Sequence, residues 1–402
     1  MADASPSVRA LPLKGLTILV VESFGAGPYG SMMLADLGAT VIKIENRKSG
    51  GDPSRAMGPY FLGEHDSQYF TCLNLNKKSI CLNLATPLGT RAFLRLVEHA
   101  DAVMNNLRGD GAEKLGLTYD ALKAHNARIV CCHISAYGRD NERKTWPGYD
   151  YLMQAEAGFM HLTGEPGNVP SRVGVSMIDF MTGTMAALGL VSAILQARET
   201  GTGRDVDTCL FDVALHQLSY TGTWQLNEKV RFERQARSAH GSAAPVQIFP
   251  TEDGWLFIMC MTEGFWKELL RAIKREDLAT DERFKTMALR RENRAALIPI
   301  LDDVFVQHPN AHWLDRLRPN VPAAPVFDLA QALGNKFPES TGMIREISHP
   351  NRPDLRVFAN PMKLDGARLE SRAPSSLGAD TVAVLREAGF TNVEIEQLES
   401  AN

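Results

Sequence analysis

A strand, a glycine-rich turn, a helix and a second strand follow one another near the start of the chain. Leu16 to Val21 is almost entirely β-branched or aliphatic, Gly25 to Pro28 form a turn, and Tyr29 to Leu37 is typical of a helix that Gly38 ends. A second strand, Thr40 to Ile44, follows at once. Apolar strands joined through a helix by short connections are typical of parallel sheets covered on both faces. This unit predicts an α/β fold with a Rossmann-like sheet.

The same alternation continues through the first half of the chain. Further strands are expected at Ile80 to Leu84, Ala102 to Met104 and Ile129 to Ile134, with a helix from Gly89 to His99 between the first two. A long apolar helix is expected from Gly183 to Ala197. The sheet is therefore expected to extend well beyond the first unit.

The segment ETGTGRDVD around Thr200 ends the long helix and marks the exit from the first domain. Beyond it, a strand at Trp255 to Cys260 and helices at Phe265 to Ile273 and Arg291 to Val306 suffice for a smaller α/β domain. We expect a large domain in residues 1–205, a linker in 206–245, a small domain in 246–324 and a C-terminal segment in 325–402.

Charge and cysteine content exclude several classes of protein. Lys and Arg number 43 against 47 Asp and Glu, so the net charge of −4 provides no basic field for nucleic acid or an anionic membrane surface. We find no signal peptide and no run of about 18 apolar residues. The 6 cysteines lack CxxC spacing, and no HExxH motif is present. We expect a reduced cytoplasmic protein without metal, membrane or nucleic-acid partners.

The turn contains a literal GxGxxG pattern, formed by Gly25, Gly27 and Gly30, and Glu45 follows at the end of the second strand. This arrangement is typical of dinucleotide binding, because glycines let a pyrophosphate approach N–H groups at a helix N-terminus. Pro28 removes one of those donors. The pattern also serves other phosphate-bearing cofactors, or close packing of the helix on the strand.

Two acids stand in settings that suit carboxylate chemistry. Asp179 lies alone within the apolar segment Val173 to Gly183, and Asp150 follows Trp146-Pro-Gly-Tyr149. Each could instead cap a helix N-terminus or lie in its first turn. No GxSxG motif supports serine hydrolysis.

In order and spacing, the motifs of this chain resemble the class III (CaiB/BaiF, formyl-CoA transferase type) CoA-transferases over essentially its full length. The matching segments are Leu13-Lys-Gly-Leu-Thr-Ile-Leu, Ala26-Gly-Pro, Leu37-Gly-Ala-Thr-Val-Ile-Lys-Ile-Glu45, Asn76-Lys-Lys-Ser-Ile80, Lys114-Leu-Gly-Leu, Pro147-Gly-Tyr-Asp150, Thr163-Gly-Glu-Pro, Val173-Gly-Val-Ser-Met-Ile-Asp179, Thr200-Gly-Thr-Gly and Ala373-Pro-Ser-Ser-Leu-Gly378.

The resemblance implies an interlocked, ring-like homodimer in which residues 325–402 return to the large domain. It implies that Asp179 is the nucleophile, with Tyr149 and Asp150 close to it, and that coenzyme A rather than NAD occupies the glycine turn. The residues that it places along coenzyme A are Phe24, Gly25, Ala26, Leu82, Asn106 and Lys114.

The expected reaction moves CoA from an acyl-CoA to a second carboxylic acid through an aspartyl–acyl anhydride and an aspartyl–CoA thioester. A carboxylate that attacks a thioester releases the CoA thiolate, so the thioester energy is kept without ATP. A flexible loop around Gly241 could supply N–H donors to the oxyanions. Arg237 and His240, in a segment similar to succinyl-CoA-using members, could pair with the distal carboxylate of a dicarboxylic acid. We expect succinyl-CoA as the donor.

Four alternatives compete with this function. An α-methylacyl-CoA racemase is disfavoured because that branch has His where this chain has Tyr149, which removes a residue for two-base proton transfer. Specificity for formyl-CoA or oxalyl-CoA is disfavoured, because the family members with that specificity have a Gln at the position of Gly25. An NAD-dependent oxidoreductase and a CoA-binding protein without catalysis complete the alternatives.

Overall fold

The computed structural model describes residues 10–229 and 231–401, which form two compact units. The first unit contains the chain up to Ala157, Val173–Thr223 and the segment from Lys336 onward. The second unit contains Gly158–Arg172 and Trp224–Asn335. The domain ranges 1–205, 206–245, 246–324 and 325–402 stay a prediction.

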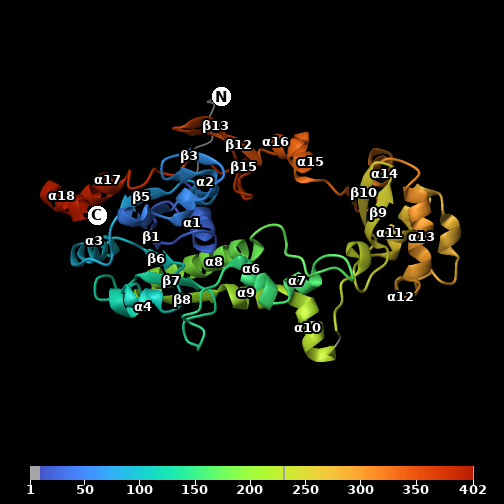
Figure 1. Cartoon of the computed structure of the whole chain (residues 1–402), viewed down its shortest axis with the longest axis horizontal. Helices are drawn as coiled ribbons and strands as arrows, with labels where there is room; N and C mark the ends of the chain where they lie inside the picture. Colours follow the sequence, from blue (N-terminus) through green and yellow to red (C-terminus); the bar gives the residue numbers. More distant parts are fainter. Residues whose placement is uncertain (1–9, 230, 402) are drawn as a thin grey trace, which may run out of the picture. The chain divides into compact units, whose positions relative to one another are not determined.

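The first unit is built on a six-stranded parallel sheet with the order β5-β2-β1-β6-β7-β8. The chain proceeds outward from β1 in one direction and then from β6 in the other, which is the doubly wound strand order. The predicted α/β class with a central parallel sheet is confirmed (Figure 1). The strands are β1 (Thr17–Val21), β2 (Thr40–Glu45), β5 (Lys78–Cys81), β6 (Ala102–Asn105), β7 (Val130–Ser135) and β8 (Arg204–Cys209).

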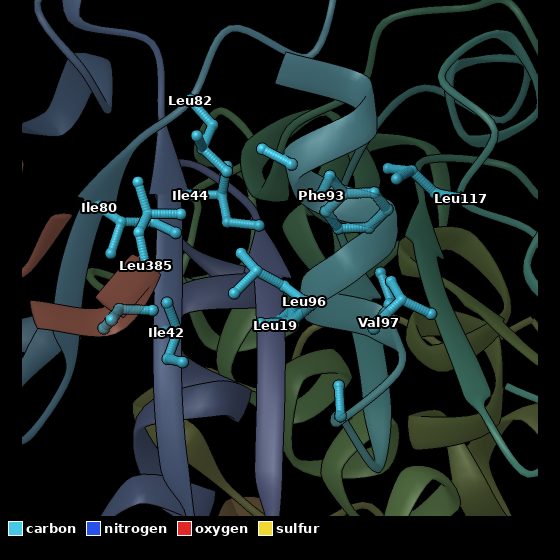
Figure 2. Packing of buried hydrophobic residues seen from close by; sticks show 14 of the residues in the cluster. Leu19, Ile42, Ile44, Ile80, Leu82, Phe93, Leu96, Val97, Leu117 and Leu385 are labelled. Carbon is cyan, nitrogen blue, oxygen red and sulfur yellow. The ribbon is translucent and has the colours of Figure 1, made fainter. Parts of the chain in front are cut away.

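Helices cover the sheet, and two of its inner strands are buried along their whole length. Every residue of β6 and β7 is buried. On one face, Phe93 and Leu96 of α3 (Pro87–Val97) pack with Leu19 and Ile42 of the strands (Figure 2). Leu385 of α17 (Thr381–Glu387) joins the same cluster, so the C-terminal segment completes this core. Burial of each such side chain contributes about 1.5–3 kcal/mol.

Helix α8 (Met177–Thr200) is the longest helix of the first unit and packs against α1 (Ala26–Asp36), β7 and β8. It begins six residues before the expected start at Gly183. By length and composition alone it could cross a membrane. The helix contains no unbroken run of about 18 apolar residues, and its packing on the sheet accounts for its buried apolar face.

Shorter elements complete the first unit. Its other helices are α2 (Gln68–Asn74), α4 (Gly111–Lys114), α5 (Tyr119–Leu122), α6 (Asp150–Glu156), α9 (Leu210–Gln217), α16 (Lys336–Ser340) and α18 (Asn392–Ala401), while α10 (Ser219–Glu228) continues into the second unit. Its small strand pairs are β3 (Phe61–Gly63) with β4 (Asp66–Ser67), β12 (Ile344–His349) with β13 (Arg352–Phe358), and β14 (Lys363–Leu364) with β15 (Ala367–Arg368).

The second unit has its own antiparallel sheet and its own core. Its strands are β9 (Val246–Thr251), β10 (Gly254–Met259) and β11 (Ala323–Pro325). Its helices are α7 (Phe159–Leu162), α11 (Glu263–Ile273), α12 (Met287–Glu292), α13 (Arg294–Phe305), α14 (Asn310–Leu317) and α15 (Leu329–Gly334). The helix expected from Arg291 to Val306 is present as α13 but begins three residues later, because Asn293 leaves helical geometry and its side-chain amide donates to the carbonyl of Leu289.

Candidate active site

A cavity of about 240 Å³ lies at the carboxyl ends of the strands in the first unit, where the strand order reverses between β1 and β6. Ligands of doubly wound sheets bind at such a switch point, because the loops after the two strands diverge there. Its walls come from the loops after β1, β6, β7 and β8, from the segment before α6 and from α8. The lining residues are Ser23, Phe24, Gly25, Ala26, Asn106, Leu107, Arg108, Ile134, Ser135, Ala136, Trp146, Pro147, Gly148, Tyr149, Asp179 and Leu210.

Asp179 is the carboxylate in this cavity. It lies in the first turn of α8, three residues after the N-cap Ser176, so the alternative that Asp179 is itself an N-cap is wrong. Burial, and then the charge of Asp150, raise the pKa of Asp179 to about 7. A carboxylate with little water around it attacks carbonyl carbon more readily than a hydrated one does.

Asp150 supports the helix that carries Asp179. It is the first residue of α6, whose N-cap is Tyr149, so the N-cap alternative for Asp150 is also wrong. Its buried carboxylate accepts a hydrogen bond from the backbone N–H of Asp179 at 3.0 Å and another from Gln154 at 2.6 Å. Because first-turn N–H groups lack partners within their helix, Asp150 caps α8 rather than α6.

Tyr149 and Phe24 form an aromatic pair beside Asp179. The two rings meet edge to face with 6.2 Å between centroids, and Tyr149 is 60% exposed. Phe24 has a φ of +58°, which is rare for a bulky residue. Strained backbone of this kind persists only where the surroundings hold it.

The glycines of the turn allow close contacts inside the protein, because a Cβ at these positions would collide with neighbouring atoms. A Cβ on Gly25 would lie 2.1 Å from Oδ2 of Asp179, and one on Gly27 would lie 2.9 Å from Cγ of Asn106. A Cβ on Gly30 would lie 2.4 Å from the carbonyl oxygen of Gly183, where α1 crosses α8. Close packing therefore requires glycine at Gly27 and Gly30, and the closeness of the Asp179 carboxylate requires glycine at Gly25.

Glu45 does not fit the dinucleotide alternative. Both of its oxygens bind Arg55, at 2.8 Å each. They also accept hydrogen bonds from the backbone N–H of Asp52 and the hydroxyl of Ser79. Since Glu45 is buried and so fully bonded, a nucleotide ribose could reach it only by breaking this network.

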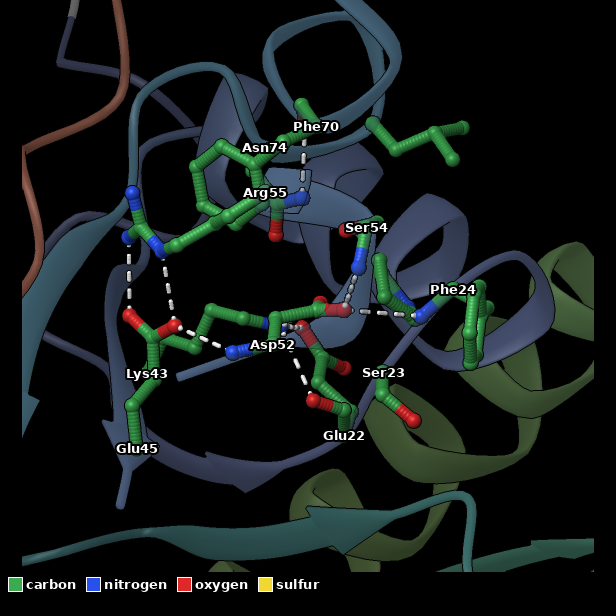
Figure 3. A network of polar contacts seen from close by, with 12 residues as sticks. Glu22, Ser23, Phe24, Lys43, Glu45, Asp52, Ser54, Arg55, Phe70 and Asn74 are labelled. Carbon is green, nitrogen blue, oxygen red and sulfur yellow. Dashed lines mark hydrogen bonds and ion pairs between the residues drawn. The ribbon is translucent and has the colours of Figure 1, made fainter. Parts of the chain in front are cut away.

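A buried group of charges, which no sequence motif indicated, lies beneath the strained turn (Figure 3). Lys43 pairs with Asp52 at 2.9 Å and donates to the carbonyl of Glu22 at 3.0 Å. Asp52 accepts from the backbone N–H of Phe24 at 3.3 Å. Burial would raise the pKa of Asp52, but Lys43 holds it below its usual value. The network fixes the turn that carries Phe24.

Lys77 holds the other end of the same turn. Its ammonium donates to Glu22 and to the carbonyl of Pro28, both at 2.8 Å. Burial lowers the pKa of Lys77 to about 8. Lys77 thus holds the chain before Gly25 through an ion pair to Glu22 and after it through a hydrogen bond to Pro28.

The six residues expected along coenzyme A divide into two groups. Phe24, Gly25, Ala26 and Asn106 line the cavity with Asp179, and the Asn106 amide binds the backbone N–H and carbonyl of Ser23 at 2.9 and 2.6 Å.

The other two do not line this cavity. Leu82 is 1% exposed within the hydrophobic core. Lys114 points to solvent and pairs with Asp110.

The expected substrate loop lies in the second unit. Both oxygens of Asp302 accept from the guanidinium of Arg237 at 2.6 Å. His240 accepts from the backbone N–H of Ser242 at 3.2 Å, and Gly241 is exposed with open space at its Cβ position.

Sequence reasoning missed Gln154. It is completely buried and stands four residues after Asp150, so the two side chains meet on one face of α6. That spacing becomes a signal only when the start of α6 is known. Arg108 and Trp146, which also line the cavity, were missed as well.

A model of CoA-transferase family III matches residues 13–381 of the chain. The chain belongs to this family. A family III relative from Agrobacterium fabrum, named succinate–glutarate CoA-transferase, is 30% identical over 388 residues, which cover 94% of this chain and 96% of the relative. The human succinyl-CoA:glutarate CoA-transferase is 31% identical over 378 residues, covering 94% and 86%. The crystal structure of a CaiB/BaiF family protein from Brucella suis is 32% identical, with a TM-score of 0.81 over 94% of this chain and 100% of that one.

Proposed function

We propose that this family III protein transfers coenzyme A from succinyl-CoA to a second, dicarboxylic acid, with Asp179 as the nucleophile. One observation carries the proposal: the carboxylate of Asp179 faces a cavity at the switch point of the sheet, in contact with the glycine turn. The names of the relatives support the choice of substrates, since both join succinate or succinyl-CoA to glutarate.

The first half of the reaction loads CoA onto the enzyme. An oxygen of Asp179 attacks the thioester carbonyl carbon, a C–O bond forms, and the C–S bond breaks with its electron pair leaving on the CoA thiolate. The thiolate then attacks Cγ of Asp179 in the mixed anhydride and expels the donor acid as a carboxylate. An aspartyl–CoA thioester remains.

The second half reverses these steps with the acceptor. The carboxylate of the acceptor attacks Cγ of Asp179, releases the thiolate and forms a new anhydride. The thiolate then takes the acyl group, which frees Asp179. No proton is transferred, so the site needs an ionised carboxylate and stabilised oxyanions rather than a general base.

The start of α1 is well placed to stabilise those oxyanions. The helix begins at Ala26, directly after Gly25, which contacts Asp179. Its first N–H groups have no partner within the helix, and the helix dipole favours negative charge there. Arg237, His240 and Gly241 stay proposed contacts for the distal carboxylate and for oxyanions, although Arg237 would have to share its guanidinium with Asp302.

The same proposal includes a homodimer. Met185, Leu188 and Leu195 expose 41%, 62% and 65% of their surface along one side of α8. An apolar stripe of this kind on a helix is typical of a face that a protein partner covers. A second copy of the chain fits the family resemblance.

A defined assay tests the proposed reaction. Succinyl-CoA is incubated with a panel of carboxylic acids, and the CoA esters are identified by mass spectrometry, with the Asp179→Asn variant as the control. New CoA esters of dicarboxylic acids formed only by the wild type support the proposal. If free CoA accumulates and no new ester forms with any acid, the proposed transfer from succinyl-CoA is wrong.

A further inference from the structure

Gln154 makes three hydrogen bonds near the proposed nucleophile through one side chain. Its amide nitrogen donates to Oδ1 of Asp150 at 2.6 Å and to the carbonyl of Val175 at 3.2 Å. Its amide oxygen accepts from the backbone N–H of Val173 at 2.9 Å. These partners fix which end of the amide is which, because only the nitrogen can donate.

The bonds form a continuous path to Asp179. Gln154 holds one oxygen of Asp150, and the other oxygen of Asp150 accepts from the backbone N–H of Asp179. The segment Val173 to Val175, which Gln154 also holds, leads directly into the N-terminus of α8. Both routes determine where the first turn of α8 lies.

Gln154 does not itself reach the cavity. It is 0% exposed and is not among the lining residues. Its effect on the reaction must therefore pass through Asp150 and through the backbone of residues 173–175.

We propose that Gln154 is a positioning residue for CoA transfer, which sets the depth and direction of the Asp179 carboxylate by holding Asp150 and the entry to α8. The inference rests on the proposed function of Asp179. Reactive groups displaced by about 1 Å can lose about 100-fold in rate. Removal of this amide is expected to slow attack on the thioester by a factor of that order.

The Gln154→Leu variant tests this role when it is compared with a matched amide elsewhere. Asn126 also binds three backbone groups with one amide: the carbonyls of Val97 and Ala100 and the N–H of Arg128. It does not line the cavity. Asn126→Ala is therefore expected to lose stability while each folded molecule keeps its transfer rate, whereas Gln154→Leu loses the rate.

Gln154→Glu gives a pH dependence of activity that would not appear if Gln154 only stabilised the fold. A carboxyl at this position would lie as close to Asp150 as the amide does, and two carboxylates so close share one proton. The protonated Glu side chain can donate to Asp150 and accept from Val173, as Gln does. Loss of the shared proton turns the bond into a repulsion.

The ionisable groups near the pair also bear on this pH dependence. Glu at position 154 would face Asp150 on its own helix, with Asp179 of α8 beyond it, and Tyr69 on α2 interacts electrostatically with Asp179. The contacts that Val173 and Val175 make with Gln154 are backbone ones. We expect Gln154→Glu to lose activity as pH rises through a range in which the wild type and Gln154→Leu stay constant.

The decisive measurement is the rate at which Asp179 is converted to its hydroxamate by succinyl-CoA and hydroxylamine, per folded molecule. A roughly 100-fold fall in Gln154→Leu, with the new alkaline decline in Gln154→Glu, supports the proposal. Equal rates in wild type and Gln154→Leu, or pH profiles of Gln154→Glu and wild type that coincide, overturn it. No hydroxamate in a wild type that transfers CoA overturns the role of Asp179 instead.

Discussion

The backbone of Gly25 touches the carboxylate of Asp179, and a Cβ on Gly25 would lie only 2.1 Å from Oδ2. Gly25→Ala must therefore displace that carboxylate or the turn. We expect the transfer rate to fall by about 100-fold, because the displacement exceeds what near-attack geometry allows. Steady-state assays with succinyl-CoA measure the effect.

The matched control for this substitution is Gly334→Ala, since a Cβ on Gly334 meets open space. We expect this variant to keep the wild-type rate. A Gly25→Ala enzyme as active as Gly334→Ala would show that Asp179 has room to move without cost.

Gly30→Ala should act on stability. Its Cβ would lie 2.4 Å from the carbonyl oxygen of Gly183, which is backbone and cannot rotate away, so α1 and α8 must separate. Overpacking of this kind costs about 1–3 kcal/mol. Urea denaturation should give a lower midpoint, and an unchanged midpoint would mean that the two helices are not packed this tightly.

Acid should inactivate the enzyme through Asp179. Its pKa is raised to about 7 by burial and by Asp150, and only the ionised form attacks the thioester. We therefore expect kcat/KM to fall as pH drops below about 7. In Asp150→Asn the repelling charge is gone, so this acid limb should move to lower pH; a limb that stays in place would assign it to another group.

Asp179→Asn should be nearly inactive and also more stable. Loss of a nucleophile commonly costs 10⁴-fold or more in rate. A raised pKa in the folded state means that ionisation of Asp179 opposes folding, and this cost grows as pH rises from about 4 to about 7. Allowing for solvent in the cavity, Asn should gain about 1–2 kcal/mol at pH 8.

Thermal unfolding of the wild type and Asp179→Asn at pH 8 and pH 5.5 checks this sign. The advantage of Asn should shrink at the lower pH. An Asn variant that is less stable than the wild type at pH 8 would show that the carboxylate stabilises the fold.

The exposed side of α8 should be covered in solution. We expect sedimentation velocity to show a dimer that persists at nanomolar concentration, because an interlocked interface is part of the fold. Of the three residues in this stripe, only Leu195 is more exposed than Leu188. We expect Leu188→Glu to weaken the dimer, because it places a charge on this face. A monomeric wild type under these conditions would contradict the proposal.

Strands β1, β6 and β7 of the parallel sheet were predictable from the sequence because they are largely buried and consist mainly of apolar residues. The start of α8 was not, since the N–H of Asp179 in its first turn finds its acceptor on Asp150, 29 residues earlier. Sequence periodicity does not report a partner of that kind. The start of a helix can thus depend on tertiary contact.

The glycine turn was also predictable from the sequence, whereas the residues that support it were not. The GxGxxG pattern was visible, but whether its glycines face ligand or protein depended on Asn106 and Gly183, which fold back onto it. Lys43, between Ile42 and Ile44 in β2, gave no indication that it would meet Asp52 beneath Phe24. Arg237 was expected to be free for substrate, but Asp302 occupies its guanidinium.

The edge strand β5 is completed by residues 300 and 301 positions further along the chain. The backbone N–H of Ser79 donates to Asp380, and that of Cys81 donates to Thr381. On the ribosome, β5 is therefore synthesised long before the side chains that close its edge exist. Until then, the first unit presents an unpaired sheet edge and an open core beside it, a state that favours chaperone binding or aggregation. The yield of native protein should thus depend on how quickly the last quarter of the chain follows.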